Sequence, residues 1–280
     1  MKEFSLDMMK PRKETPKSVS SSTIPEDHVF DFRNPKPPIL VEPTLDPQSG
    51  LVPYWSASLL KKFEKCPYSV FLRYVKRIME PSNEAMERGT KIHQMAEDYV
   101  QGICDELPKE LIKFERDFIE LKEQYEEDIT KERYVLIEDD WAYRSDWTQT
   151  DWSAKDVWLR MKLDVFIRES LTCAKIIDHK TGRKFGNELS HSEQAMIYAI
   201  GAFVRYPELE YIECEFWYLD HGEKLFKIFR RFEFETFLKR IEQRALVLTT
   251  CTEFLPKPSK SACKWCHYLK TGDCEYGSLT

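Results

Sequence analysis

The sequence predicts an α/β (α+β) fold, in which helices flank a β-sheet. Two observations predict the sheet: apolar and polar residues alternate over residues 157–182, and they alternate again over 211–219 and 224–234. A third predicts the helices, because apolar residues recur every three or four positions in the segments around these strands. With 280 residues, 42% of them hydrophobic, the chain can bury the core of one large domain or two small ones.

The composition narrows the class of protein. Charged residues make up 32% of the chain and the net charge is −6, which is not the strongly basic balance usual in nucleic-acid-binding domains. No apolar run reaches membrane-spanning length and no signal-peptide core is visible, so we expect a cytoplasmic protein in a reducing compartment. The eight cysteines are then expected as thiols or metal ligands before disulfides.

Residues 1–53 are predicted to be a tail. Nine of the fifteen prolines lie there, together with a serine-rich run. Such a segment buries too little apolar surface to order itself, so we expect it to be disordered or to lie as an extended strap on the folded body. The folded domain is predicted to span residues 54–280.

Residues 54–76 have helical spacing, with Ser56 or Ser58 as the N-cap. Proline is unfavourable inside a helix, so we expect a break at Cys66 and a second helix that Pro67 opens. A cysteine at such a junction can be presented outward. Taken alone, it is more simply a small buried hydrophobe.

Three elements follow before the central strands. A helix is expected over residues 84–101, with His93 on its apolar stripe, where a lone histidine is more often a core residue than a ligand. A long amphipathic helix is expected over 107–128, and a strand over 134–141. Glu138 on that strand could add a carboxylate to a site, although an exposed edge position is the simpler interpretation.

Two aspartates mark the central pair of strands. Alternation places Asp178 and Lys180 on one face of the second strand and His179 on the other. Asp164, on the first strand, can converge with Asp178 if an odd-numbered loop such as residues 169–173, or a bulge, connects them. Buried charges are costly unless a cation or phosphate offsets them, so the pair indicates a divalent-metal site. A solvated strand face is the alternative.

The segments after the central strands complete the sheet and its cover. Residues 190–206 are apolar nearly all round, which predicts a buried helix. Gln194 and Tyr198 lie one turn apart on it, where either a site or structural hydrogen bonding would account for them. Two further strands and a closing helix over 235–250 are expected to follow.

The C-terminal segment contains a cysteine motif with metal-ligand spacing. Cys263, Cys266 and Cys274 form C-x2-C-x7-C, and three thiolates need a fourth ligand. The local candidate is His267, which would make a zinc site. The distant candidate is Cys66, which would complete a four-cysteine set suited to iron–sulphur or zinc.

The order of these motifs resembles a known family. A Cys-Pro-Tyr helix, a Gly-Thr-x-Ile-His helix, an Asp strand, an Asp-x-Lys strand, a Gln-x-x-x-Tyr helix and a three-cysteine cluster follow one another between Tyr54 and Cys274. This order is similar to the RecB-type branch of the PD-(D/E)xK nuclease superfamily, and most to its iron–sulphur exonucleases of CRISPR adaptation, phages and recombination. In many members a glutamate stands where this chain has Asp178.

The resemblance implies a restriction-endonuclease-like mixed sheet, with the N-terminal helical segment packed against the C-terminal cysteines. It also implies a site for Mg²⁺ or Mn²⁺. The implied ligands are His93, Asp164, Asp178 and the backbone carbonyl of His179. The implied partners in catalysis are Lys180, which would position or deprotonate the attacking water, and Gln194 and Tyr198, which would orient the lysine and the scissile phosphate.

The resemblance further implies a [4Fe–4S] cluster, with Zn²⁺ as the alternative. Its implied ligands are Cys66, Cys263, Cys266 and Cys274. The implied activity is a metal-dependent DNA exonuclease that prefers single strands, acting in recombination, repair or phage DNA processing, alongside partner proteins of a recombination or replication complex. Three alternatives stay open: a zinc-stapled nucleic-acid-binding module, a non-catalytic scaffold, and a double-strand-specific or endonucleolytic enzyme.

Overall fold

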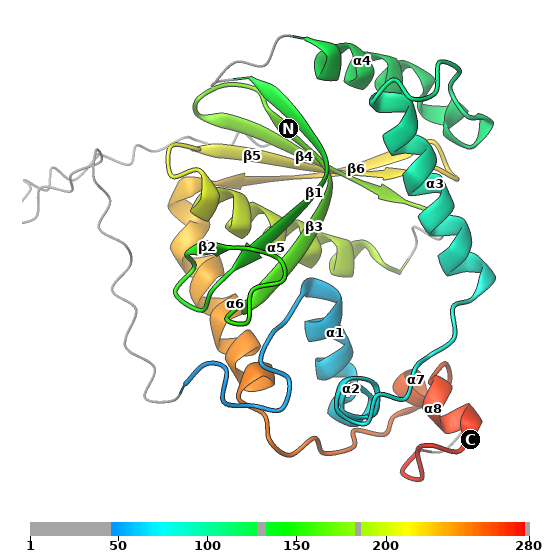
Figure 1. Cartoon of the computed structure of the whole chain (residues 1–280), viewed down its shortest axis with the longest axis vertical. Coiled ribbons are helices and arrows are strands. Elements are labelled where there is room, and N and C mark those ends of the chain that lie inside the picture. Colours follow the sequence, from blue (N-terminus) through cyan, green and yellow to red (C-terminus); the bar gives the residue numbers. More distant parts are fainter. Residues whose placement is uncertain (1–45, 128–132, 183–185, 278–280) are drawn as a thin grey trace, which may run out of the picture. The chain divides into compact units, whose positions relative to one another are not determined.

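Six strands form one mixed sheet in the order β2-β1-β3-β4-β5-β6 (Figure 1). β4 and β5 pair parallel, whereas every other neighbouring pair is antiparallel. This computed structural model describes residues 46–127, 133–182 and 186–277. The strands are β1 (Tyr134–Tyr143), β2 (Gln149–Thr150), β3 (Leu159–Arg168), β4 (Cys173–Lys180), β5 (Tyr211–Tyr218) and β6 (Glu223–Arg230).

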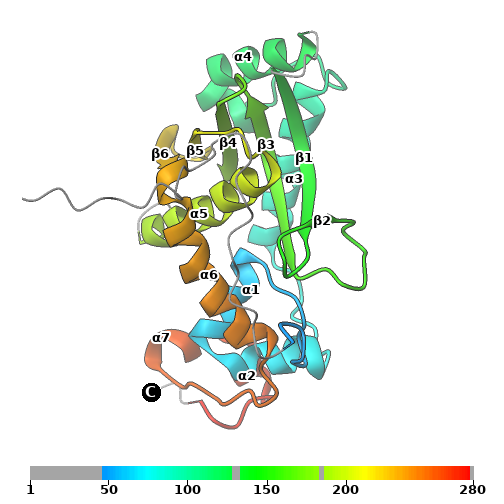
Figure 2. The ribbon, with the colours of Figure 1, turned by 90° about the vertical axis from the view of Figure 1, so that its left-hand side faces the viewer.

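Helices cover both faces of this sheet, with α5 and α6 on one side and α3 on the other (Figure 2). Each face carries its own cluster of buried side chains. The first face is covered by α1 (Ala57–Lys65), α5 (Glu188–Arg205) and α6 (Phe234–Thr249). The second is covered by α3 (Glu84–Val100), the 3-10 helix η2 (Lys109–Phe114) and α4 (Glu115–Glu126). The mixed sheet flanked by helices confirms the predicted fold class.

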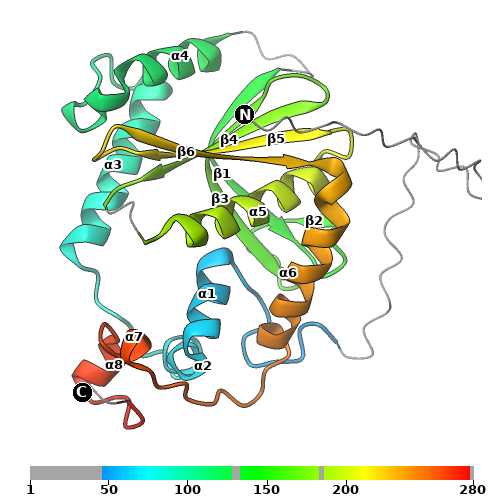
Figure 3. The ribbon, with the colours of Figure 1, turned by 180° about the vertical axis from the view of Figure 1, so that it is seen from behind.

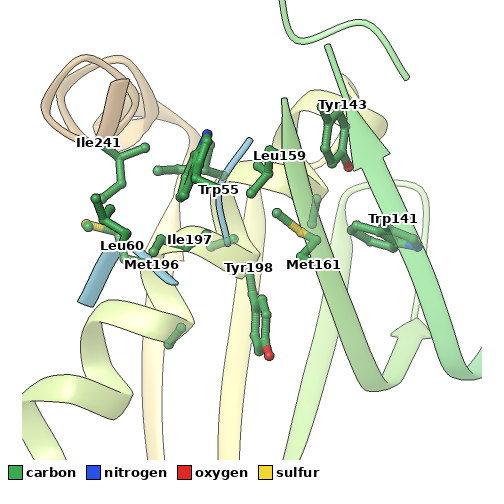
Figure 4. Close-up of a cluster of buried hydrophobic side chains, with 14 of the residues drawn as sticks. Trp55, Leu60, Trp141, Tyr143, Leu159, Met161, Met196, Ile197, Tyr198 and Ile241 are labelled. Atoms are coloured by element: carbon green, nitrogen blue, oxygen red, sulfur yellow. The ribbon is translucent and has the colours of Figure 1, made fainter. Parts of the chain in front are cut away.

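The larger cluster packs α5 closely against the sheet (Figure 4). A Cβ atom added at Gly201 would lie 2.5 Å from Sδ of Met161, so a larger residue there would require this flexible side chain to move. The Tyr143 hydroxyl donates to the Gly201 carbonyl across the same contact, at 2.8 Å. These contacts pack the helix that carries Gln194 and Tyr198 against the strands.

The predicted helix break is present. α1 begins after Ser56, whose hydroxyl accepts from the Leu59 amide at 3.2 Å, and it ends at Cys66. Pro67 opens the short helix α2 (Pro67–Val70), which continues as a π-helical turn, η1 (Phe71–Val75). The C-terminal helices α7 (Lys260–Cys263) and α8 (His267–Thr271) lie beside α2 (Figures 1 and 3).

Two element boundaries were predicted wrongly. The helix expected over residues 107–128 is divided into η2 and α4, because Phe114 leaves the helical region (φ −122°, ψ 27°) and stacks on Trp217 at 5.3 Å. The strand expected to reach residue 234 ends at Arg230. Arg231 then turns inward and donates to three backbone carbonyls, those of Phe203, Tyr206 and Leu209.

The predicted tail, residues 1–53, lies mostly outside the described residues, and its extent stays a prediction. Its last residues are described and contact the body: the Gly50 amide donates to the Thr249 carbonyl at 2.8 Å, and Val52 is buried. Within the described part of the chain, no helix is both long and apolar enough to cross a membrane.

Candidate active site

Asp164 and Asp178 lie side by side on β3 and β4. The ladder between these strands runs from Arg168↔Ala174 to Val165↔Ile177, and the two aspartates follow one step beyond. Five residues separate the first pair, which is the odd-numbered connection that the convergence requires. Burial and the neighbouring Asp178 raise the pKa of Asp164, and both carboxylates are nearly inaccessible, at 8% and 3% exposure. Two adjacent buried carboxylates are a donor set that fits a divalent cation.

The strand alternation is interrupted at this point. The β1–β3 ladder pairs Ile137 with Val165 and Asp139 with Leu163 but has no pair between them. Leu163 packs in the cluster under α5, whereas Val165 packs in the cluster under α3 and α4, so the side chains change face between them. The alternation expected over residues 157–182 is therefore interrupted here. The register is the same on both sides of the gap, so the break is confined to Glu138 and Asp164, which lie opposite each other.

His93 reaches the same place from α3. Its Nδ1 atom lies 3.3 Å from Oδ1 of Asp164 and 3.6 Å from Oε1 of Glu138. Burial lowers the pKa of His93, but hydrogen bonds with Asp164 and Glu138 outweigh it and raise the pKa to about 10. The side chain of His93 is 29% exposed.

Asp178 is held by residues from β4 and α5. Lys180 Nζ lies 2.5 Å from Oδ2 of Asp178, and Gln194 Nε2 donates to Oδ1 at 3.1 Å. Lys180 also donates to Oε1 of Gln194, at 3.1 Å, and the Tyr198 hydroxyl donates to Oδ1 of Asp178 at 3.3 Å. Burial and the charge of Asp178 raise the pKa of Tyr198, so its hydroxyl stays a donor. The structure thus brings Lys180 together with Asp178, Gln194 and Tyr198.

His179 points to the opposite face, as its position predicts. Its backbone amide donates to Oδ2 of Asp164 at 2.6 Å, while its ring lies against Phe118 and Trp217. Burial and the nearby His93 lower the pKa of His179 to about 3, so the ring is neutral.

The environment of Glu138 differs from the one that the sequence predicted. Its side chain is only 13% exposed, where an exposed edge was expected, and Lys162 Nζ pairs with its Oε2 at 2.9 Å. Its backbone has a left-handed φ of 51°, which alternation patterns cannot reveal. The acidic run from Glu138 to Asp140 was the available signal.

The four predicted cysteine ligands line one cavity of about 270 Å³. Cys66 comes from the α1–α2 junction, and the others come from the segment of α7 and α8 (Figure 3). All four are free thiols, and His267 also lines the cavity. Tyr268 anchors this segment: it is 1% exposed, and its hydroxyl donates to the Ile78 carbonyl at 3.2 Å.

Comparison with known families gives a decisive match. Residues 54–271 fit the family model of the PD-(D/E)XK nuclease superfamily. The chain belongs to this superfamily. Its members use divalent metals. No protein of curated function matches the sequence.

Solved structures resemble this PD-(D/E)XK chain only in part. A protein from Eubacterium rectale, provisionally assigned as an exonuclease, is 14% identical with a TM-score of 0.43, covering 86% of this chain and 96% of that one. The alkaline exonuclease LHK-Exo from Laribacter hongkongensis is 10% identical with a TM-score of 0.37, covering 79% and 94%. The family assignment rests on the family model and not on these alignments.

Proposed function

We propose that the protein is a metal-dependent DNA exonuclease that hydrolyses phosphodiester bonds and prefers single-stranded DNA. One observation carries the proposal: buried Asp164 and Asp178 lie on adjacent strands, with Lys180 Nζ 2.5 Å from Asp178 and His93 Nδ1 3.3 Å from Asp164. Carboxylates cluster in this way where a cation offsets their charge, and a lysine beside them suits an anionic substrate.

The proposed ligands of Mg²⁺ or Mn²⁺ are His93, Asp164, Asp178 and the carbonyl of His179. When bound, such a cation supplies Lewis-acid chemistry to the phosphate and lowers the pKa of water. Lys180 would add a positive charge at the phosphate and position the attacking water or accept its proton. Gln194 would hold the lysine Nζ in place, because its Oε1 accepts from that nitrogen at 3.1 Å.

Tyr198 and Gln194 would act on Asp178 as well. Both donate to its Oδ1 atom, which stabilises the ionised carboxylate within a buried site. The same two side chains would orient the scissile phosphate. The single-strand preference, the roles in recombination, repair or phage DNA processing, and the partner proteins of a recombination or replication complex follow from the resemblance to iron–sulphur exonucleases.

We further propose that the cysteine cavity binds a [4Fe–4S] cluster. Support comes from the four thiols that line one cavity. Four cysteine thiolates are the ligand set of a [4Fe–4S] cluster, with zinc as the alternative.

The activity is tested with end-labelled linear and circular DNA, each single- and double-stranded. Linear single strands should be degraded with Mg²⁺ or Mn²⁺ and left intact with EDTA, while circles resist because an exonuclease needs an end. Cutting of circles would indicate an endonuclease, and preferential loss of duplex would overturn the single-strand preference. DNA binding without cutting under any divalent cation would identify the non-catalytic scaffold instead.

A further inference from the structure

Beside the cation position described above, we propose a second one that is richer in nitrogen ligands. Its ligands are the imidazoles of His93 and His179 and the carboxylates of Glu138 and Asp164. The proposal rests on the proposed function in that Asp164 would be shared between the two positions and His93 would pass from the first position to the second. It assigns to the side chain of His179, and to Glu138, roles that a single cation near Asp178 does not use.

The His179 ring carries the first part of the argument. It is 3% exposed, and neither ring nitrogen has a hydrogen-bond partner among the residues that the structure describes. Its neighbours Phe118 and Trp217 would suit a leucine equally well, without the desolvation cost of two unpaired polar atoms. One ring nitrogen nevertheless lies within 4.8 Å of an oxygen of Asp164 and a nitrogen of His93, which is the spacing of ligands around one ion.

Glu138 carries the second part. Its left-handed φ of 51° is unfavourable for a residue with a side chain, and it lies where β1 leaves its ladder with β3. At this break in the ladder, Oε1 of Glu138 lies 3.6 Å from His93 Nδ1, while Oε2 pairs with Lys162. Backbone strain at this point is accounted for if the carboxylate is needed as a ligand.

The two faces of β4 separate the positions. Asp178 points towards α5, where Tyr198 and Gln194 hold it, whereas the His179 ring points towards α4. Asp164 serves both sides, because Oδ1 lies near His93 and Oδ2 accepts from the His179 amide. With both positions filled, His93 belongs to the second, and the first keeps Asp164, Asp178 and the His179 carbonyl.

The donor set selects the kind of metal. Two imidazoles with two carboxylates suit a first-row transition-metal ion better than Mg²⁺ or Ca²⁺, which take oxygen ligands. Mn²⁺ is the useful probe, because it binds carboxylate and imidazole and avoids thiols, and because electron paramagnetic resonance counts the free ion. Bound Mn²⁺ also reports a coordinated nitrogen through the modulation of its spin echo.

The purified protein should bind two Mn²⁺ per chain, one of them with nitrogen modulation. His179→Leu, which keeps the backbone carbonyl, and Glu138→Gln should each weaken the nitrogen-coordinated Mn²⁺ by more than about tenfold and leave the other bound. Asp178→Asn is the matched control on the same strand. It should weaken the other ion and keep the nitrogen signal.

One bound Mn²⁺, with a count and nitrogen signal that neither His179→Leu nor Glu138→Gln changes, would overturn the second position. Metal-dependent cutting would still stand in that case. Two bound ions with the expected losses, in a protein that cuts no DNA, would overturn the nuclease and keep the second position. Because Glu138 lies on another strand, its variant decides the matter even if His179→Leu fails to fold.

Discussion

The carboxylate site and the cysteine cavity are built in opposite ways. Asp164 and Asp178 lie within the sheet, with apolar clusters on both faces, and their partners hold one another without any ligand. The cysteine cavity joins a helix junction at Cys66 to α7 and α8, which are only four and five residues long. The fold therefore positions the first region, whereas the second joins short elements that a ligand on its thiols would hold together.

Because the two regions are built differently, we expect mutations in one to affect activity and mutations in the other to affect stability. Short helices gain little from their own hydrogen bonds, so tertiary contacts or ligands must hold them. A metal centre that ties Cys66 to Cys274 would close a loop of most of the domain, and its binding free energy would become folding free energy. Changes in the carboxylate site should thus cost activity with little stability, and changes in the cavity should cost stability first.

The largest effect is expected from Lys180→Ala. Loss of the ammonium group beside Asp178 should slow DNA cleavage by more than about 100-fold, because it removes positive charge from the transition state. The melting temperature should change little, since the strand and its apolar neighbours remain. Rates on labelled DNA and thermal unfolding test both, with exposed Lys227→Ala as the control lysine. Full activity in the variant would contradict the assignment of the site.

The next largest effect is expected from Cys66→Ser. Protein purified without oxygen should be brown with about four irons per chain, and the variant should lose both colour and iron. Its free energy of unfolding should fall by about 3 kcal/mol or more, because a long loop is no longer closed. The control is Cys104→Ser, because Cys104 lies outside the cavity, and this variant should keep the colour, the iron content and the free energy of unfolding. A colourless protein with one zinc, sensitive to His267→Ala and indifferent to Cys66→Ser, would favour the local site.

His93→Ala should have an intermediate effect. If His93 is a ligand, cleavage should need about 10–100-fold more Mn²⁺, with little change in melting temperature, because the side chain is 29% exposed. Metal titrations of the cleavage rate, with thermal unfolding of the same samples, measure both. A lower melting temperature with an unchanged metal response would show a structural role instead.

The sequence predicted the features that depend on local chemistry. Pro67 requires a helix break, so the sequence alone places Cys66 at a junction between helices. The convergence of Asp164 and Asp178 followed from strand alternation and an odd-numbered connection, and the ladder has that register. Both predictions used rules in which one residue or one parity decides the outcome.

The features that escaped prediction depend on tertiary contacts. The left-handed backbone at Glu138 lies where side chains change face, but the residue types on either side still alternate between apolar and polar. Phe114 ends η2 because it can stack on Trp217, which lies about a hundred residues further along the chain. Neither the backbone at Glu138 nor the stacking of Phe114 on Trp217 can be recognised from the local sequence pattern.

The smallest effect is expected at Glu215, a buried carboxylate outside both regions. It is 7% exposed and accepts from Trp217 Nε1 at 2.6 Å, with Lys175 Nζ at 3.0 Å and Lys224 Nζ at 3.4 Å. Burial alone would raise the pKa of Glu215, but these partners outweigh it and lower the pKa to about 2. In the unfolded chain the pKa of a glutamate is about 4.5. Folding therefore stabilises the ionised form of Glu215 relative to the protonated form.

The stability that Glu215 contributes should be complete above pH 4.5 and should be lost as the pH falls towards 2. Glu215→Gln should lower the free energy of unfolding by about 1–3 kcal/mol at pH 7, and the difference from the unmodified protein should shrink steadily below pH 4.5. Urea unfolding at pH 7, 5 and 3 measures this difference, and Glu213→Gln on the same strand is the control. A constant difference across this range would mean that the carboxylate is not held ionised by Lys175 and Trp217. Because the network lies on the sheet, iron content at pH 7 should stay unchanged, which would separate the stability of the sheet from that of the cysteine cavity.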